Sequence, residues 1–387
     1  MTINNEHKKL NVPNLRFPEF QGEWEKCKLG ELTTKVGSGS TPKGGNAVYT
    51  SVGHCFVRSQ NVGMGYLILD DIAHIDDDIH QKHKATELSE DDVLLNITGA
   101  SIGRTAIATK EIEGGNVNQH VCIIRANSKV SPKFLCNYIQ TKKIQNYIRS
   151  LQTGGSREGL NFDQIRSFPI SLPSIAEQNK IAQLLDKLNE RIATQNKIID
   201  KLQSLIKGIR NDVFGKLRKS VGFNAMISDV LSYEQPQPYI VENTEYTAEG
   251  IPVLTANKAF VLGYTSETNG IYDKGDCIIF DDFTLDCKYV DFPYKIKSSA
   301  IKILTAKNKE ILRYTFEFLK YLDLSTDEHK RHYIAEMQNQ EFVLPTMQIV
   351  RTIAHAFSAL SLRMESVMKQ RNMFETQKQY LLRQMFI

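Results

Sequence analysis

Residues 172–214 of this chain read LPSIAEQNKIAQLLDKLNERIATQNKIIDKLQSLIKGIRNDVF, and residues 344–386 read LPTMQIVRTIAHAFSALSLRMESVMKQRNMFETQKQYLLRQMF. The two stretches align without a gap at a constant offset of 172 residues, and both open with Leu-Pro and close with Phe. A repeat of this length in a chain of 387 residues indicates two equal halves, each a globular region followed by a long helix. Such a chain holds two similar modules at a fixed separation, as expected of a protein that recognises two sites.

Both repeated stretches carry a seam of mainly apolar residues spaced alternately four and three apart, which is the heptad pattern of a coiled coil. We predict an intramolecular, antiparallel two-helix coiled coil. Ordinary core helices of one large domain are the alternative, but a strict 3.5-residue period rarely persists over five heptads in two places. The seam consists of Ile181, Leu185, Leu188, Ile192, Gln195, Ile199, Leu202, Ile206, Ile209 and Val213, and then of Ile353, Phe357, Leu360, Met364, Val367, Arg371, Phe374, Lys378, Leu381 and Met385. Its polar interruptions are Gln195, Arg371 and Lys378.

The start and the length of the first helix also follow from the sequence. Ser174 and Glu177 have the spacing of a capping box, in which each side chain satisfies an amide of the first turn, and Pro173 lies just outside. A helix of about 37 residues is roughly 55 Å long, whereas one turn of B-DNA is roughly 34–36 Å. Two modules on such a rod would lie about one to one and a half DNA turns apart.

Composition fits a folded protein of two or three domains, with a hydrophobic fraction of 41%. No run of about 18 apolar residues occurs, and residues 1–17 have no signal-peptide core, so we expect a cytoplasmic protein. The six cysteines include no CxxC pair, which favours reduced, mostly buried thiols over a zinc site.

Charge is unevenly distributed along the chain. The total is +4, but residues 177–220 carry ten basic and five acidic side chains, and residues 346–387 carry six and two, so the rest of the chain is net acidic. A domain that binds nucleic acid alone is usually basic. We therefore expect local basic surface, together with partner chains that contribute much of the contact with DNA phosphate.

The two globular regions share a skeleton. Apolar runs at 66–69, 93–97 and 121–124 indicate strands, and 131–150 indicates a helix that is broken near Thr141. In the second region, 276–280, 300–304 and 310–322 match the last two strands and the helix. The predicted fold class is α/β, with two α/β domains, two long antiparallel coiled-coil spacer helices and a pseudo-twofold half-repeat. The predicted boundaries are 1–23 for an N-terminal extension, 24–171 for the first domain, 172–220 for the first spacer helix, 221–343 for the second domain and 344–387 for the second spacer helix.

Loops of the first domain contain the residue types that contact DNA. Residues 32–69 include no acidic side chain but seven glycines, which let the backbone approach phosphate, beside hydroxyl, amide and basic groups. Polar turns follow at 96–104, 116–120 and 153–161. Plain surface loops and tight turns are the alternative interpretation of these segments. The candidate DNA-binding residues are Lys35, Ser38, Ser40, Thr41, Lys43, Arg58, Gln60, Asn61, Thr98, Ser101, Arg104, Asn118, Gln119, Ser156 and Arg157.

The second domain offers a different set, in which Gln and Asn suit adenine, and Arg and Lys suit guanine or phosphate. The candidates are Gln235, Gln237, Tyr239, Thr255, Asn257, Lys258, Thr284, Lys288, Lys297, Ser298, Lys330 and Arg331, beside Asp281 and Asp282, which can accept from cytosine. The acidic segment 70–92 is expected to face away from phosphate. Its three histidines, at 74, 80 and 83, are expected to be solvated rather than bound to metal.

The sequence contains no recognisable catalytic set. Residues 37–45, GSGSTPKGG, lack the glycine before Lys43 that a Gly-x4-Gly-Lys-Ser/Thr phosphate loop needs. The tetrapeptide DFPY at 291–294 has Phe where the base-gripping Asn/Asp-Pro-Pro-Tyr/Phe loop of a DNA aminomethyltransferase has Pro. We therefore predict no catalytic residue, metal or cofactor in this chain. The alternatives are a DNA adenine methyltransferase or nuclease with an unrecognised site, and a scaffold that does not bind DNA.

Four segments together resemble the specificity subunit of type I restriction-modification systems: PNLRFPEFQGEWEKCKLGEL at 13–32, ITGASIGRTAI at 97–107, TGGSREGLNFDQI at 153–165 and LPSIAEQNKIAQLLDKLNERI at 172–192. Their order and spacing, with the half-repeat, are more specific than any one of them. The second spacer departs from the pattern, because TMQIVR at 346–351 lacks the Glu-Gln found at 177–178.

The resemblance implies a non-catalytic organiser of a larger complex. In such subunits two target-recognition domains each recognise one half of a split, asymmetric DNA site in the major groove, and the spacer helices set the unspecified gap. The spacers also dock two methyltransferase subunits, which use S-adenosylmethionine to methylate adenine. Two restriction subunits, which combine a motor and a nuclease, use ATP and Mg²⁺ to translocate and cut unmodified DNA.

Overall fold

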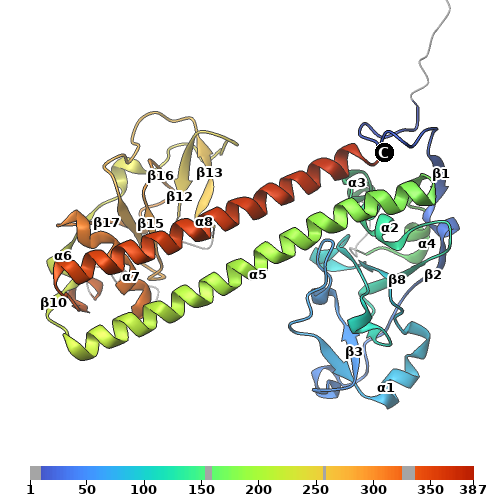
Figure 1. Ribbon diagram of the computed structural model, residues 1–387, viewed down its shortest axis with the longest axis horizontal. Coiled ribbons are helices and arrows are strands. Elements are labelled where there is room, and N and C mark those ends of the chain that lie inside the picture. Colours follow the sequence, from blue (N-terminus) through green and yellow to red (C-terminus); the bar gives the residue numbers. More distant parts are fainter. Residues whose placement is uncertain (1–9, 153–158, 256–258, 325–335) are drawn as a thin grey trace, which may run out of the picture. The chain divides into compact units, whose positions relative to one another are not determined.

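The computed structural model describes residues 10–152, 159–255, 259–324 and 336–387, which form two compact units. Unit 1 consists of Met1–Thr194 with Gln370–Ile387, and unit 2 consists of Gln195–Lys369. The two repeated stretches form the long helices α5 (Ile175–Ser220) and α8 (Met347–Gln384), and each helix contributes one end to each unit (Figure 1).

Within each unit the two long helices run antiparallel, as predicted. In unit 1, Ile181 near the start of α5 shares a hydrophobic core with Leu381 near the end of α8. In unit 2, Phe214 near the end of α5 shares a core with Phe357 near the start of α8. An arginine lies over an aromatic ring in each unit. The Arg191 guanidinium lies 5.5 Å from the Phe374 ring centroid, and the Arg210 guanidinium lies 5.8 Å from the Phe357 ring centroid.

The heptad seam governs burial even where the residue is polar. Lys378 is only 5% exposed, and this burial lowers the pKa of its amine. Lys378 is therefore buried because it falls on the helix seam, although its side chain is polar. The predicted packing residues Ile181, Leu185, Leu188, Ile192, Ile199, Phe357 and Val367 are buried, and Leu202, Ile353, Leu360, Met364 and Phe374 are half-buried.

Unit 1 contains three sheets. A four-stranded sheet has the order β2-β8-β5-β6, a three-stranded sheet has the order β4-β3-β7, and β1 pairs with β9. All pairs are antiparallel except β3 with β7. The strands are β1 (Glu25–Lys28), β2 (Thr33–Ser38), β3 (His54–Val57), β4 (Ala73–Ile75), β5 (Val93–Asn96), β6 (Thr105–Ile107), β7 (Asn116–Val117), β8 (Val121–Ala126) and β9 (Pro169–Leu172). The short helices are α1 (Asp77–Lys82), α2 (Pro132–Ile139), α3 (Lys142–Ser150) and α4 (Phe162–Arg166).

Unit 2 repeats this plan strand for strand. Its sheets have the orders β11-β17-β14-β15, β13-β12-β16 and β10-β18, and only β12 with β16 is parallel. The elements are β10 (Ala225–Met226), α6 (Ile227–Val230), β11 (Leu231–Glu234), β12 (Ile251–Leu254), β13 (Val261–Thr265), β14 (Cys277–Asp281), β15 (Cys287–Val290), β16 (Lys295–Ile296), β17 (Ile301–Ala306), α7 (Leu312–Leu322) and β18 (Glu341–Phe342). The predicted α/β half-repeat is therefore confirmed.

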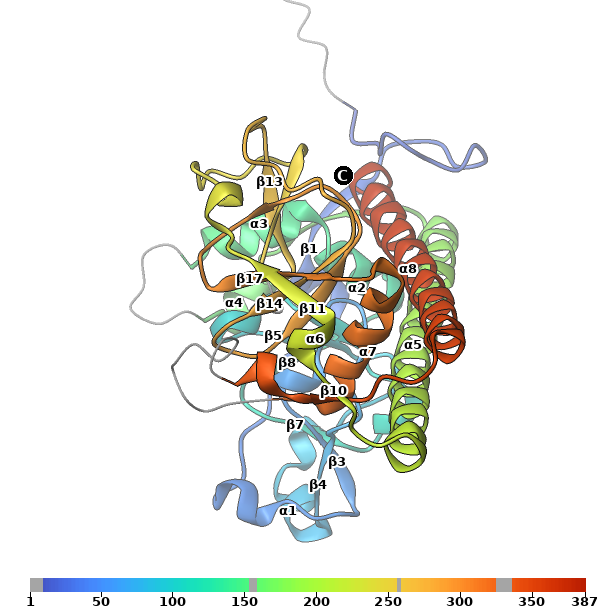
Figure 2. The same ribbon diagram turned by 90° about the vertical axis from the view of Figure 1, so that its left-hand side faces the viewer.

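The central strands of each unit alternate between two cores, because successive side chains of a strand face opposite sides. In β8, Cys122 and Ile124 face the helices, whereas Val121 and Ile123 face the three-stranded sheet. In unit 2 the helix α7 covers one face of the sheet β11-β17-β14-β15 (Figure 2). Each unit is thus built from a helical layer, a four-stranded sheet and a three-stranded sheet.

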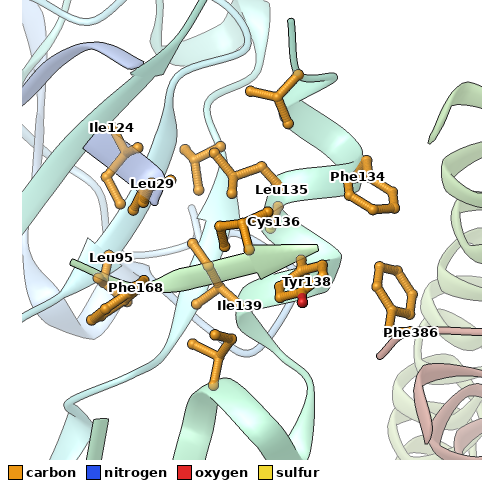
Figure 3. Packing of buried hydrophobic residues seen from close by; sticks show 14 of the residues in the cluster. Leu29, Leu95, Ile124, Phe134, Leu135, Cys136, Tyr138, Ile139, Phe168 and Phe386 are labelled. Carbon is orange, nitrogen blue, oxygen red and sulfur yellow. The ribbon is translucent and has the colours of Figure 1, made fainter. Parts of the chain in front are cut away.

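The phenylalanine that closes each repeat occupies the same kind of pocket in each unit. The Phe386 ring lies 5.2 Å from Phe134 and 5.5 Å from Tyr138, centroid to centroid (Figure 3). In unit 2, Phe214 lies 5.2 Å from Tyr314 and 5.4 Å from Phe318 of α7. Aromatic contacts of this kind add to the burial of apolar area. The repeat thus anchors each long helix to the domain beside it.

Three local expectations need correction. Residues 66–69 form no strand: the Gly63 amide donates to the Tyr66 carbonyl across a tight turn, and Leu67 forms only an isolated bridge with Val62. Half of the predicted capping box is present. The Glu177 amide donates to Ser174 Oγ at 3.4 Å, but the two oxygens of the Glu177 carboxylate accept from Arg16 at 2.8 Å each. The third correction concerns the histidines.

One histidine of the acidic segment, His80, is buried and not, as predicted, solvated. His80 is 2% exposed, stacks on His54 with the ring centroids 3.7 Å apart, and bonds Asn116 Oδ1 at 2.8 Å. The other two, at 74 and 83, are half-buried. They lie in the small sheet β4-β3-β7 and in the turn after α1, where an acidic sequence suggested an outer surface.

Candidate nucleic-acid interface

Unit 1 gathers several predicted DNA-binding residues at one edge of its four-stranded sheet. Strands β2 and β5 end at this edge and β8 begins there, since both run antiparallel to β8, with Ser38 opposite Cys122 and Asn96 opposite Val121. Gly39 follows β2 and passes so close to the Val117 carbonyl that a Cβ atom would lie 1.6 Å from that oxygen. Only glycine fits there, which explains one of the glycines in this loop.

Four side chains at this edge form a continuous hydrogen-bonded relay. The Thr41 hydroxyl donates to Gln119 Oε1, and Gln119 Nε2 donates to His120 Nε2 at 3.0 Å. Since Nε2 of His120 accepts, Nδ1 carries the proton and donates to Thr98 Oγ1 at 2.5 Å. Gln119 and Thr41 are exposed, and the other two are half-buried. The relay is neutral and holds the four side chains against one another.

The loops that carry the relay also contain cationic and hydroxyl side chains. Arg104 and Lys43 are exposed, and Ser40 Oγ bonds His83 Nδ1 at 2.9 Å. Arg104 follows the turn after β5 and immediately precedes β6, so it lies at the same edge as Thr98. Such groups can hold phosphate while the amide and the imidazole face base edges.

Other predicted residues of unit 1 stabilise the fold. Asn61 is 1% exposed and its Nδ2 donates to two backbone carbonyls, while Arg58 and Gln60 both bond Asp71 Oδ2, at 3.2 and 2.6 Å. Lys35 donates to the Ala85 carbonyl at 2.8 Å. Bonds within the fold therefore occupy these side chains. Asn118 is likewise buried, and its Oδ1 accepts from the His120 amide.

The corresponding sheet edge in unit 2 is charged. Lys302 of β17 and Asp282, which follows β14, are each 1% exposed, with Nζ and Oδ2 3.7 Å apart. Lys302 Nζ also donates to Gln235 Oε1 at 2.9 Å and lies 5.7 Å from the ring centroid of Tyr233. Sequence reasoning missed Lys302, although a lysine inside the apolar run IKILTA was the available signal.

The remaining candidates of unit 2 fall into three groups. Exposed residues are Gln237, Thr284, Lys297 and Ser298, with Lys297 Nζ 5.6 Å from the Tyr246 ring centroid. Buried or paired residues are Tyr239, whose hydroxyl donates to Glu234 at 2.6 Å, Thr255, and Lys288, which pairs with Asp286 at 3.2 Å. Outside the described residues lie Asn257, Lys258, Lys330 and Arg331, together with Ser156 and Arg157 of unit 1.

The four buried cysteines are protonated thiols. Burial raises the pKa of the Cys136 thiol to about 11 and those of Cys122, Cys277 and Cys287 to about 12, so these cysteines are neutral thiols near pH 7. Among the described residues, no three His, Cys, Asp or Glu side chains gather as metal ligands do. Within the same residues, no helix is apolar and long enough to cross a membrane.

Known proteins resemble this chain in sequence and in fold. Residues 21–204 match the family model of the type I restriction modification DNA specificity domain. The type I restriction enzyme EcoR124I/EcoR124II specificity subunit of Escherichia coli is 43% identical over 126 residues, which are 31% of this chain and 31% of that protein. A putative type I restriction enzyme MjaX specificity subunit of Methanocaldococcus jannaschii is 22% identical over 54% of this chain and 50% of its own length.

The fold comparison extends over nearly the whole chain. The crystal structure of the type I restriction-modification S subunit from M. genitalium matches with a TM-score of 0.65 at 16% identity, and covers 97% of this chain and 99% of that one. The curated relatives are matched over half of their length or less. The matched domain and the sequence relatives nevertheless agree with each other, and residues 21–204 of this chain are similar to the DNA specificity domain of type I restriction-modification systems.

Proposed function

We propose that this chain is the DNA-recognition subunit of a type I restriction-modification complex and that it is not itself an enzyme. Each unit would bind one half of a split, asymmetric site through the sheet edge described above. One observation carries the proposal: the two units share sheet order and strand direction, yet the same edge bears a neutral relay in unit 1 and an ion pair in unit 2. A common scaffold with different polar groups suits two different half-sites.

The predicted boundaries of the two target-recognition domains, 24–171 and 221–343, belong to this proposal. So do the partners, which would be two methyltransferase subunits and two restriction subunits that supply the chemistry with S-adenosylmethionine, ATP and Mg²⁺. The charge pattern supports such partners, because the globular parts are net acidic although the chain totals +4. Acidic modules hold DNA weakly on their own and need basic surface from other chains. The complex would act in the cytoplasm, where its DNA substrate is.

An insertion in a spacer helix tests the proposal directly. Four extra residues after Lys201, which lies within α5, lengthen a helix by about 6 Å, nearly two base pairs at about 3.4 Å each. Methylome sequencing of a host that expresses the chain with its methyltransferase should then report a wider gap between unchanged half-sites. The same four residues added before Met1 serve as the control and should leave the gap unchanged. Altered half-sites with an unchanged gap would contradict the proposal.

Arg104 provides a test that is confined to unit 1. In the complex with the methyltransferase, Arg104→Ala should weaken binding to the first half-site and lower the salt dependence by about one phosphate contact. Lys110→Ala is the matched control, because Lys110 is also exposed but follows β6 at its other end. Equal binding by both variants across a salt titration would remove Arg104 from the interface.

Ligand binding distinguishes this proposal from the methyltransferase alternative. The purified chain should show no heat of binding with S-adenosylmethionine in calorimetry, whereas its methyltransferase partner should bind. Saturable binding by the isolated chain would favour an unrecognised enzyme site.

A further inference from the structure

We propose that Gln119 is a specificity-determining residue of unit 1, held by its neighbours in the orientation that recognises one adenine in the major groove. The inference rests on the proposed DNA-recognition function and names a base that this sheet edge of unit 1 would recognise. Gln119 is exposed and lies in the turn between β7 and β8, one residue before His120.

The relay holds the Gln119 amide group at both ends. Gln119 Oε1 accepts from the Thr41 hydroxyl, and Nε2 donates to His120 Nε2. An amide rotated by 180° would place an oxygen against Nε2 of His120 and an NH₂ group against Thr41. The rotated amide would lose its bond to the imidazole unless His120 changed its own proton position. In that tautomer the Thr98 hydroxyl would donate to His120 Nδ1, so both arrangements keep all three bonds and both leave Gln119 one free N–H and one free lone pair.

The fixed amide has one donor and one acceptor left for a ligand. A glutamine amide offers two N–H donors and two lone pairs on its oxygen. Within the described residues, His120 uses one donor and Thr41 uses one lone pair. The remaining N–H and the remaining lone pair match adenine, whose major-groove edge presents N7 as acceptor and N6–H as donor. Guanine presents two acceptors, so its O6 would face the amide oxygen without a proton between them.

Holding the amide in advance strengthens this discrimination. A free exposed glutamine rotates and flips, and binding must then order it. Thr41 and His120 act as positioning residues, because they orient Gln119 and need not touch the base themselves. The corresponding turn of unit 2, before β17, contains Ser299 and Ala300 in place of the Gln-His pair. Recognition of adenine by this route is therefore confined to the half-site of unit 1.

Modified bases test the inference in the complex of the full chain with its methyltransferase. After methylome sequencing has defined the half-sites, duplexes carry 7-deazaadenine, which lacks N7, at one adenine at a time. Wild type should lose binding by about fivefold or more at one position of one half-site, since a full bidentate contact contributes about 10–100-fold. Gln119→Met, which removes donor and acceptor but keeps the length, should bind adenine and 7-deazaadenine equally at that position. Gln81→Met, an exposed glutamine on α1, should behave as wild type.

The positioning residues give a second readout. His120→Ala and Thr41→Val keep Gln119 but remove one anchor each, so both should reduce discrimination at the same position and leave the other half-site unchanged. A purely structural role would weaken binding at all positions alike. Fluorescence of Trp24, the single tryptophan of the chain and 3% exposed in unit 1, reports whether each variant is folded.

The outcomes separate this inference from the proposed function. A wild-type complex without any sequence preference would overturn both. A wild-type complex with a clear site, but with no position in the half-site of unit 1 that responds to loss of N7, would overturn the role of Gln119 alone, whether or not the variants fold. The same conclusion follows if Gln119→Met folds and still binds the 7-deazaadenine duplex more weakly than the adenine duplex.

Discussion

The two units place different chemistry at equivalent points of one scaffold. In unit 1 the strand that begins at this edge carries Cys122, which faces the helical core. The corresponding strand of unit 2 carries Lys302, whose amine is buried against Asp282 and Gln235. Unit 1 therefore holds its exposed polar groups through neutral hydrogen bonds, whereas unit 2 holds Gln235 through a buried charge.

This difference shows which parts of the scaffold are free to vary. The sheet order, the helical layer and the aromatic anchors are common, so they satisfy requirements of packing that both units share. A charge is tolerated at the edge only because its partner is buried with it, since an unpaired buried charge is strongly destabilising. We therefore expect substitutions in the shared core to act alike in the two units and substitutions at the edge to act differently.

The largest effects should come from the shared aromatic anchors. Phe214→Ala and Phe386→Ala should each destabilise their own unit by about 3–5 kcal/mol, because each leaves a cavity among buried rings. The effect of Phe214 should be the larger, since its ring is fully buried and that of Phe386 is 7% exposed. Trp24 fluorescence follows unit 1, while circular dichroism follows both units. A Trp24 transition shifted as far by Phe214→Ala as by Phe386→Ala would show that the units do not unfold independently.

The buried ion pair should give the next largest effect, and this effect should differ from that of a substitution at the same edge of unit 1. Asp282→Ala leaves the Lys302 amine, 1% exposed, without its carboxylate partner and should lower the free energy of unfolding by about 3–5 kcal/mol. Thr98→Ala, at the edge of unit 1, removes one neutral hydrogen bond and should cost about 1 kcal/mol. Urea denaturation monitored by circular dichroism measures both. The double variant Asp282→Ala/Lys302→Met should recover much of the loss, and no recovery would mean that the charge of Lys302 is not the cause.

A smaller effect of opposite sign is expected at Lys378. Its partner in the repeat is Ile206, which packs on the core of unit 2, whereas Lys378 buries an amine whose pKa is lowered by the burial. Lys378→Met should therefore stabilise unit 1 by about 1–2 kcal/mol at neutral pH. Burial lowers the pKa of Lys378, so the unfolded chain binds this proton more tightly, and wild-type stability rises with pH through the window between the lowered pKa and 10.5. The advantage of the variant should shrink across that window, and a constant advantage would exclude this cause.

The smallest effect concerns the helix that differs between the units. In unit 1 the chain breaks between α2 and α3, where Thr141 Oγ1 accepts from the Ile144 amide as the cap of α3, whereas α7 of unit 2 is one continuous helix of 11 residues. Thr141→Ala should cost about 1 kcal/mol. Thr141→Ser is the matched control and should be nearly neutral in a thermal melt followed by Trp24 fluorescence. Equal losses in both variants would point to packing of the Thr141 methyl group and not to the cap.

Part of the fold and of the candidate site was predictable from the sequence, and there are physical reasons why the rest was not. The helix break at Thr141 was predicted because a cap is a local signal. Residues 66–69 were mistaken for a strand, since Tyr66 to Leu69 is apolar but the glycines just before it form a tight turn. The candidate residues at 38–41, 98–104 and 118–120 do meet at one sheet edge. Asn61 and Tyr239 were chosen by residue type, which does not reveal that their polar groups bond within the fold.

The sequence by itself determined the half-repeat, the two long helices and their apolar seam, because these depend on periodicity along the chain, which is visible without coordinates. Only the tertiary structure decided which seam positions bury a charge, as at Lys378, and which loops share an edge, as for Thr41, Thr98 and the Gln119–His120 turn. Strand pairing brings together residues that are 22 and 78 positions apart. Contacts of that range depend on sheet order and register, and no local pattern in the chain specifies them.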